Sequence, residues 1–171
     1  MAILLLIFIV LSLICFLLSR RLRKHSGLPE GEIVYSDTTA RPGELLLSQR
    51  YGMSGKPDYL LDDRNVGLIP VEVKSGVAPR NSQPYLSHLM QLAVYFLLVE
   101  EVLNSPAPYG LIRYRDRTLR IENTEELRED LLTLIKQMRK TLVSGEAHRS
   151  HNQVLRCASC SLADGCDERL P

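Results

Sequence analysis

The fold follows from residues 55–74, which read GKPDYLLDDRNVGLIPVEVK. Residues 59–61 and 68–74 are rich in β-forming side chains, and the turn-forming run 62–67 (DDRNVG) lies between them. This pattern predicts two antiparallel strands joined in a hairpin. Pro70 cannot donate a backbone hydrogen bond, so we expect the second strand to lie at a sheet edge or to be locally irregular.

The second strand of this hairpin carries charged side chains in alternation with valines. Since residues i and i+2 of a strand share a face, Glu72 and Lys74 should project together while Val71 and Val73 face the core. Asp58 would then lie roughly opposite Glu72. Two carboxylates and the Val73 carbonyl are oxygen ligands suited to Mg²⁺ or Mn²⁺, and Lys74 could stabilise negative charge. The pattern indicates metal-assisted phosphodiester hydrolysis, with a solvated Glu-x-Lys strand edge as the alternative.

A long apolar helix is predicted over residues 84–104, beginning at Pro84. His88, Gln91 and Tyr95 form a polar stripe on it at positions i, i+3 and i+7. Burying an amide without partners costs about 1–3 kcal/mol, so the stripe should face other polar groups. The polar end of the 68–74 strand is the expected partner. The alternative is a helix face partly open to water.

The remaining elements complete an α/β domain. Further strands are predicted over 33–36, 45–51, 109–114 and 118–121. The last helix should be capped by Asn123, with Glu126 completing a capping box, and should end at Gly145. Its apolar stripe comprises Leu127, Leu131, Leu134, Met138 and Leu142. Strands and helices in this order predict a mixed sheet flanked by helices over residues 33–145.

The first residues are uncharged and strongly apolar. Residues 2–18 read AILLLIFIVLSLICFLL, and the basic run RRLRKH follows at 20–25. This predicts a transmembrane anchor over 2–19, followed by a basic flank and linker over 20–32. A cleaved signal peptide is the alternative, although no positive residue precedes the apolar run and no small-x-small site follows it. The basic flank places the N-terminus outside the cell membrane and the domain in the cytoplasm.

The net charge of the chain is +1, and every charged residue lies beyond position 19. This near-neutral balance excludes a strongly basic domain that attracts nucleic acid through its overall field. Contact with nucleic acid would therefore depend on a local groove or patch.

The tail, residues 146–171, contains no periodic segment and is predicted to lack helices. It contains three closely spaced cysteines, namely Cys157, Cys160 and Cys166. In a cytoplasmic domain this spacing predicts a metal or cluster site rather than disulfides. A zinc ion could use the three thiolates together with His148 or His151. The one other cysteine, Cys15, lies inside the predicted anchor and is not expected to be a ligand.

Four motifs occur in an order that resembles a known family. They are Gly55-x-x-Asp58, Glu72-x-Lys74, Gln91-x-x-x-Tyr95 and Cys157-x-x-Cys160-x5-Cys166. Over residues 33–168 the chain resembles RecB-like nucleases of the PD-(D/E)XK superfamily. It looks most like the CRISPR-associated exonucleases with a C-terminal iron–sulfur cysteine cluster, which are related to the nuclease domain of the Dna-two helicase–nucleases.

The resemblance implies a restriction-endonuclease-like core and a role for each motif. Asp58 and Glu72 would be metal ligands, Lys74 a catalytic residue, and Gln91 and Tyr95 residues that position DNA or the metal-site groups. The implied activity is cleavage of single-stranded or fraying DNA ends with Mg²⁺ or Mn²⁺. An iron–sulfur cluster would be bound by the cysteines of the tail. The implied partners are CRISPR adaptation proteins or another DNA-processing complex.

The chain departs from the family pattern in two places. These nucleases often supply an upstream histidine ligand, but no histidine lies between His25 and His88; Asp37 or Glu44 could replace it. The family also uses a fourth cysteine far upstream, for which the chain offers only Cys15. A catalytically impaired DNA-binding or scaffolding module is therefore an alternative function. A third is recruitment of a partner through an exposed face of the 84–104 helix.

Overall fold

The computed structural model describes residues 2–25, 32–36, 45–145 and 148–171. The helices are α1 (Ala2–His25), α2 (Leu86–Val102), α3 (Glu125–Ser144), α4 (Val154–Ala158) and the 3₁₀ turn η1 (Ala163–Gly165). The strands are β1 (Glu32–Ser36), β2 (Leu46–Ser48), β3 (Met53–Gly55), β4 (Tyr59–Asp63), β5 (Gly67–Val73), β6 (Tyr109–Arg113) and β7 (Thr118–Glu122). The chain divides into two compact units, Met1–Leu131 and Leu132–Pro171. The predicted domain boundaries at 19, 32 and 145 stay predictions.

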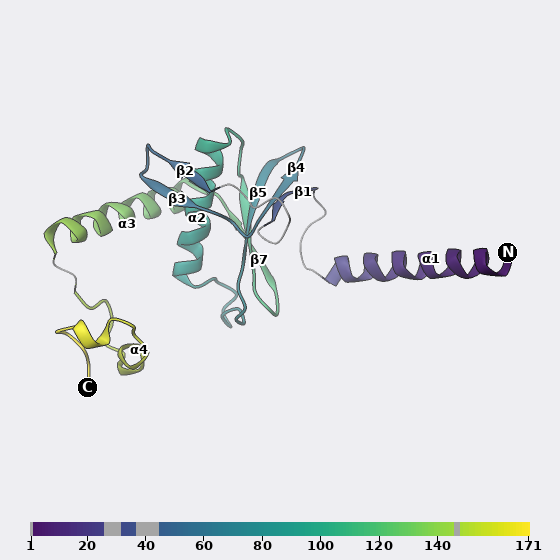
Figure 1. Ribbon diagram of the computed structural model, residues 1–171. Coiled ribbons are helices and arrows are strands. Elements are labelled where there is room, and N and C mark those ends of the chain that lie inside the picture. The colour runs from purple at the N-terminus through teal and green to yellow at the C-terminus, as the bar shows by residue number, and fades with distance from the viewer. Residues whose placement is uncertain (1, 26–31, 37–44, 146–147) are drawn as a thin grey trace. The chain divides into compact units, whose positions relative to one another are not determined.

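The main sheet has five strands in the order β1-β4-β5-β6-β7 (Figure 1). Strands β5 and β6 are parallel, and the other neighbours are antiparallel. A parallel pair needs a crossover connection, and α2 supplies it here. Strands β2 and β3 form a separate antiparallel hairpin that also packs on α2. The predicted α/β fold with a mixed sheet is confirmed, whereas β3 was missed because three residues are too short to show a period.

The hairpin of β4 and β5 is confirmed, with Tyr59 opposite Val71 and Asp63 opposite Gly67. Gly67 has a φ of +124°, and a Cβ there would lie 2.3 Å from the carbonyl oxygen of Pro106. Only glycine fits this backbone conformation and this approach. The turn therefore fixes the register that brings Asp58 to the end of β5.

The prediction for Pro70 is wrong, because β5 is the central strand of the sheet. Pro70 lies opposite Leu60 of β4, while the parallel pairing with β6 begins one residue later, at Val71. The missing amide therefore falls just before the β5–β6 ladder and removes none of that ladder's paired positions. Proline is usually confined to sheet edges because it cannot donate to a ladder, and here the ladder on the β6 side begins only after it.

Helix α2 is the centre of the core. Its buried side chains are Leu92, Ala93, Tyr95, Phe96, Leu97, Leu98 and Val99. A Cβ on Gly110 of β6 would lie 2.8 Å from Phe96 Cε1 and 2.9 Å from Leu92 Cδ1, so the glycine allows this close packing. The middle of α2 is buried, whereas Leu86, Val102 and Leu103 at the two ends of the helix are exposed. Recruitment of a partner through a partly exposed 84–104 helix therefore stays a prediction.

The start of α3 differs by one residue from the predicted cap. The hydroxyl of Thr124 accepts the Leu127 N–H at 3.2 Å, so Thr124 caps the helix. The Asn123 amide instead donates to Glu100 and to the Ala107 carbonyl, at 2.8 and 2.9 Å. Only part of the predicted apolar stripe is covered. Leu127 and Leu131 are buried, but Met138 and Leu142 are exposed.

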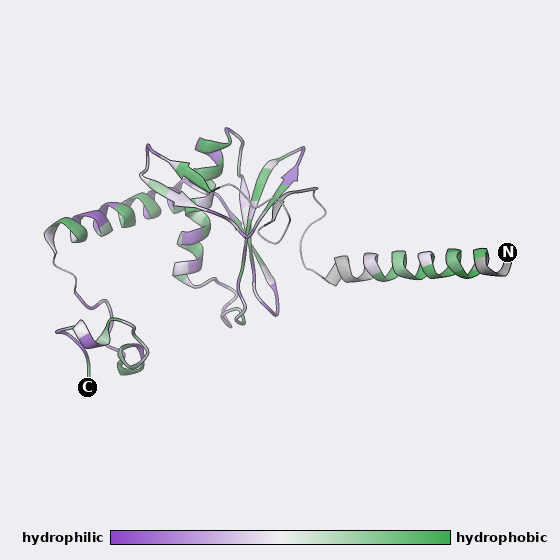
Figure 2. Ribbon diagram, viewed as in Figure 1, coloured by the Kyte–Doolittle hydropathy of each residue, from purple (hydrophilic) through white to green (hydrophobic). Residues whose placement is uncertain are grey.

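Residues 2–19 form most of α1, which is largely apolar (Figure 2). Among the helices of the described ranges, none combines the length and the apolar character needed to cross a membrane. The membrane-spanning role predicted for residues 2–19 is therefore not supported.

Candidate active site and cysteine pocket

The two predicted carboxylates meet at one end of the β4–β5 hairpin. Asp58 directly precedes β4, and Glu72 is the penultimate residue of β5. The backbone N–H of Val73 donates to Asp58 Oδ2 at 2.7 Å, which holds the Asp58 side chain against the end of β5. The hairpin therefore brings together residues that are fourteen positions apart in the sequence.

Glu72 is only 5% exposed and is the one buried side chain among the aspartates, glutamates, lysines, arginines and histidines of the described part of the chain. Its Oε1 accepts hydrogen bonds from Lys74 Nζ at 2.7 Å and from Gln91 Nε2 at 2.8 Å. A carboxylate removed from water needs such charged and polar partners. A solvated Glu-x-Lys pair on a strand edge would not be buried in this way, so that alternative does not describe the site.

Gln91 and Tyr95 extend the network from α2, as their helical spacing predicted. Gln91 Oε1 accepts from Lys74 Nζ at 2.8 Å, and Gln91 Nε2 donates to Tyr95 Oη at 2.9 Å. Tyr95 Oη in turn donates to the Lys56 carbonyl at 3.1 Å. The first motif also has a packing reason, since a Cβ on Gly55 would lie 3.0 Å from Tyr95 Cε1.

Two details differ from the sequence prediction. Val73 was expected to face the core, but its side chain is 41% exposed because it is the last residue of β5, beyond the buried cluster around Val71. His88 does not join the carboxylates. Its Nδ1 lies 2.8 Å from the hydroxyl of Tyr114, a contact across 26 positions that no local pattern could reveal.

Tyr95 should make the stability of the protein depend on pH above about pH 10. Burial raises the pKa of Tyr95 to about 12 from its usual 10.0, with a further contribution from the Glu72 carboxylate. The neutral phenol is thus favoured in the folded state, and the stabilisation is present below pH 10 and is lost as pH rises toward the folded pKa. We expect Tyr95→Phe to cost about 1 kcal/mol at pH 7. Above pH 10, wild type should lose about 1.4 kcal/mol per pH unit relative to the variant.

Urea unfolding of both proteins at pH 7, 9, 10 and 11 measures this difference. Equal pH dependence in the two proteins would contradict the assignment of a raised pKa to Tyr95.

The donor set of the site fits a divalent cation in part. Both hydrogen bonds to Glu72 fall on Oε1, and the one to Asp58 falls on Oδ2. Glu72 Oε2 and Asp58 Oδ1 take no part in these bonds, and such hard oxygen atoms suit Mg²⁺ or Mn²⁺ as ligands. Within the described ranges, however, no three His, Cys, Asp or Glu side chains gather as a metal-binding group. Asp37 and Glu44, the suggested replacements for an upstream ligand, lie outside the described residues.

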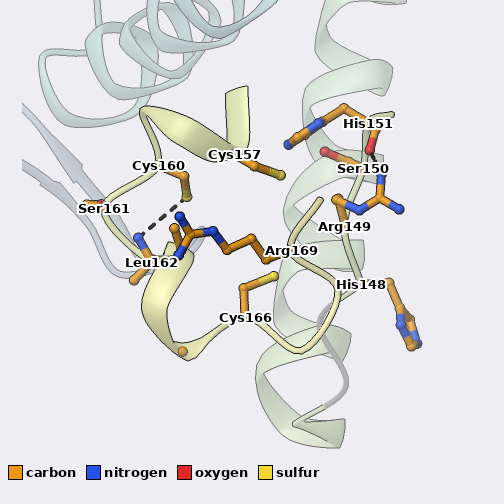
Figure 3. Close-up of a pocket in the computed structure, with 12 residues that line it drawn as sticks. His148, Arg149, Ser150, His151, Cys157, Cys160, Ser161, Leu162, Cys166 and Arg169 are labelled. Carbon is orange, nitrogen blue, oxygen red and sulfur yellow. Dashed lines mark hydrogen bonds between the residues drawn. The ribbon is translucent and has the colours of Figure 1, made fainter. Parts of the chain in front are cut away.

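The second unit contains a pocket of about 620 Å³ that is lined by all three cysteines of the tail (Figure 3). Cys157 lies in α4, which corrects the expectation of a helix-free tail. The backbone N–H groups of Leu162 and Leu170 approach Cys160 Sγ and Cys157 Sγ at 3.4 and 3.5 Å. All three cysteines are free thiols. The predicted clustering is therefore present in outline, although the sulfur atoms do not form a closed ligand set.

Both histidines that were considered as zinc ligands also line this pocket. His148 Nδ1 lies 2.7 Å from Glu168 Oε1, and His151 Nδ1 accepts the Gln153 N–H at 3.2 Å. The His148 hydrogen bond, followed by the Arg149 N–H, lowers the pKa of Glu168, so this carboxylate stays ionised beside the ring. A carboxylate on Nδ1 is the usual outer partner of a metal-binding histidine. His151 lacks such a partner in the described contacts.

A mixed sheet with two carboxylates and a lysine at one strand end is typical of phosphodiester-cleaving nucleases. The chain belongs to the PD-(D/E)XK nuclease superfamily, whose family pattern matches residues 16–167. It is 30% identical over 123 residues to the CRISPR-associated exonuclease Cas4 of Francisella tularensis subsp. novicida (strain U112), a match that covers 71% of this chain and 60% of that protein.

A second relative is the CRISPR-associated exonuclease Cas4/endonuclease Cas1 fusion of Leptospira interrogans serogroup Icterohaemorrhagiae serovar Lai (strain 56601). It is 31% identical over 124 residues, covering 70% of this chain and 23% of the fusion. The chain thus spans less than two thirds of the length of either relative. The crystal structure of SSO0001 is 19% identical with a TM-score of 0.45, covering 69% of this chain and 52% of that one.

Proposed function

We propose that this protein is a metal-dependent deoxyribonuclease that hydrolyses phosphodiester bonds, acting as an exonuclease at single-stranded DNA ends. The observation that carries the proposal is the buried Glu72 carboxylate, bonded to Lys74 and Gln91 beside Asp58. Relatives that are called exonucleases support the choice of reaction.

In this reaction a water oxygen bonds to phosphorus, the bond to the leaving sugar oxygen breaks, and that oxygen takes up a proton. Asp58, Glu72 and the Val73 carbonyl would hold Mg²⁺ or Mn²⁺, which, when bound, supplies charge neutralisation and a more acidic water. The Lys74 ammonium would face the negative charge that develops on the phosphate. Gln91 keeps Lys74 in place through its side-chain oxygen, and Tyr95 holds Gln91.

The exonuclease part of the proposal can be tested with two single strands of the same sequence, one linear and one circular, in the presence of Mn²⁺. An exonuclease degrades only the linear strand. Degradation of the circle at a similar rate would show an endonuclease, and an intact linear strand would contradict nuclease activity.

The second candidate function is a DNA-binding or scaffolding module of the same fold with impaired turnover. It is favoured by the incomplete ligand set, since only two carboxylates meet in the described part of the site. Two results together would support a binding module rather than an enzyme: wild type cleaves no DNA, and Asp58→Ala binds DNA with the wild-type affinity.

We also propose that the protein acts with CRISPR adaptation proteins or in another DNA-processing complex. The support is the relative named as a fusion of an exonuclease with an endonuclease Cas1, since proteins that are fused in one organism often act together in another. Co-purification of this chain with an endonuclease Cas1 from the same cells tests this partner.

The cysteine pocket is proposed to bind an iron–sulfur cluster, with structural Zn²⁺ as the alternative. Cys157, Cys160 and Cys166 would supply thiolates, and the N–H groups that approach two of the sulfurs suit that role. Either group would fasten a tail that has few buried side chains, since Cys157 is the only buried residue among positions 148–171.

Cys160→Ser is therefore expected to release the bound group and to loosen the second unit. Anaerobically purified wild type should show visible absorbance and bound iron, both lost in the variant, and residues 132–171 should be cut faster by protease. Zinc in place of iron would give a colourless protein with the same protease result. Cys15→Ser is the matched control and should change neither property; unchanged protease sensitivity in Cys160→Ser would contradict a bound group.

The location at the cell membrane, with the domain in the cytoplasm, stays a proposal. It is supported by the exposed apolar side chains of α1, among them Phe8 and Leu11. The test is sedimentation of the protein with membranes after a carbonate wash. Sedimentation of the full chain that is lost when residues 2–19 are deleted would support the proposal. A protein that remains in the supernatant would contradict it.

A further inference from the structure

A half-exposed aromatic ring lies at the outer end of the polar face of α2. Tyr85 is 53% exposed and immediately precedes the helix. It precedes His88 by three residues, and His88 precedes Gln91 by three. Each step joins neighbouring positions on the helix surface, so the three residues form a row that turns by about 60° at each step. Six residues of helix rise by about 9 Å, which places Tyr85 about 9 Å along the helix axis from Gln91, the residue that bonds both Glu72 and Lys74.

Neighbouring groups hold this ring in place. Tyr85 packs edge-on against His88, with ring centroids 5.3 Å apart, and against Tyr114 at 6.5 Å. The Tyr85 backbone N–H also approaches the Tyr114 hydroxyl at 3.4 Å, and that hydroxyl bonds His88 Nδ1. Tyr114 itself is 1% exposed. The ring is therefore held on one side by the buried Tyr114 and the half-buried His88, while Tyr85 itself stays 53% exposed.

The residues that pack against the ring are close to the candidate catalytic lysine. Tyr114 follows the last residue of β6, Arg113, whose carbonyl accepts the Lys74 N–H at 2.8 Å. Burial and the nearby charge of Lys74 lower the pKa of His88, so the ring that packs against Tyr85 is uncharged at neutral pH. The uncharged aromatic cluster of Tyr85, His88 and Tyr114 thus lies near Lys74.

Basic side chains border the same surface. Arg115 and Arg117 are exposed on the turn between β6 and β7, where Arg117 Nε also pairs with Asp116 Oδ2 at 2.9 Å, so that these three residues carry a net positive charge. This turn is tied to the segment joining Lys74 to Tyr85, because Arg115 N–H donates to the Gly76 carbonyl at 3.0 Å and Arg117 Nη1 donates to Ser82 Oγ at 3.3 Å. A stacking ring with positive charge beside it is the combination that holds unpaired nucleic acid.

We propose that Tyr85 is a positioning residue that stacks on a base of single-stranded DNA next to the scissile phosphate, while Arg115 and Arg117 attract the adjoining backbone. The inference rests on the proposed nuclease function and names a subsite within it. Inside a duplex both faces of a base are covered by the stacked neighbouring pairs, so Tyr85 also favours a strand that is unpaired at this point.

The test measures binding of a fluorescent single strand to the full chain, with Ca²⁺ in place of Mn²⁺ to limit cleavage, by fluorescence anisotropy. Tyr85→Ala should weaken binding by roughly 5- to 150-fold, the range for loss of one stacked base, and Tyr85→Phe should bind like wild type. A strand of abasic sites removes the stacking partner, so wild type and Tyr85→Ala should bind it equally. Leu86→Ala, which changes the neighbouring exposed residue, is the matched control and should have no effect.

Hydrolysis of a small phosphodiester, bis(p-nitrophenyl) phosphate, separates this inference from the proposed function. It has no neighbouring base, so Tyr85→Ala should cleave it at the wild-type rate with Mn²⁺. If wild type cleaves nothing yet binds single strands through Tyr85, the subsite stands and the nuclease proposal fails. Three results would overturn the inference. Wild type and Tyr85→Ala could bind the normal strand equally, Tyr85→Ala could lose the same affinity on the normal and the abasic strand, or wild type could bind no single strand.

Discussion

Replacement of Lys74 by methionine is expected to lower the rate of single-strand cleavage by about 10²- to 10³-fold, as removal of one charge-stabilising donor does in other enzymes. Lys74 Nζ lies 2.7 Å from Glu72 Oε1 and 2.8 Å from Gln91 Oε1, so it is fixed where charge would develop. Methionine keeps much of the apolar stem and removes only the ammonium. The turnover rate at saturating DNA, with Mn²⁺, measures the effect.

Loss of Lys74 also leaves the buried Glu72 carboxylate without its cation. Thermal unfolding should therefore accompany the rate measurement, to ensure that the variant is folded at the assay temperature. Lys140→Met makes the same chemical change at an exposed position of α3 and should leave the rate unchanged. If folded Lys74→Met cleaved DNA at the wild-type rate, Lys74 would not be a catalytic residue.

Replacement of Glu72 by glutamine is expected to have an effect at least as large, because it removes the negative charge that would hold the cation. The amide keeps an oxygen that can accept from Lys74 and Gln91, so the fold should be retained. We expect Mn²⁺ affinity to fall by at least about 10- to 100-fold, the range seen when even outer-shell groups of metal sites are changed. Calorimetric titration with Mn²⁺ measures this directly.

Glu129→Gln provides the matched control, since Glu129 is exposed on α3. Its Mn²⁺ affinity should equal that of wild type. Unchanged Mn²⁺ binding by Glu72→Gln would show that the ion binds elsewhere. Glu72 would then not be a metal ligand, which contradicts the proposed mechanism.

The hydrogen-bonded network of the candidate site was predictable because each part of it has a short, regular spacing. Alternation along a strand placed Glu72 and Lys74 on one face, and the helical repeat placed Gln91 and Tyr95 on another. The turn at Gly67 then fixed how the elements meet. These rules are local, and the buried contacts among the four side chains follow from them.

Features that depend on contacts between distant parts of the chain could not be predicted from the sequence. The central place of Pro70 depends on where the pairing with β6 begins, and the pairing of His88 with Tyr114 depends on the β6–β7 hairpin. The exposure of Val73 depends on where the core ends. No periodic pattern in the sequence indicates these contacts, because they join segments that are far apart in the chain.

Cleavage of an end-labelled single strand by wild type and Glu72→Gln, side by side with Mn²⁺, tests the central claim most directly. We expect wild type to degrade the strand, to lose this activity when EDTA removes the metal, and Glu72→Gln to leave the strand intact. An intact strand with metal-loaded wild type, or equal cleavage by both proteins, would contradict a nuclease centre at Asp58, Glu72 and Lys74.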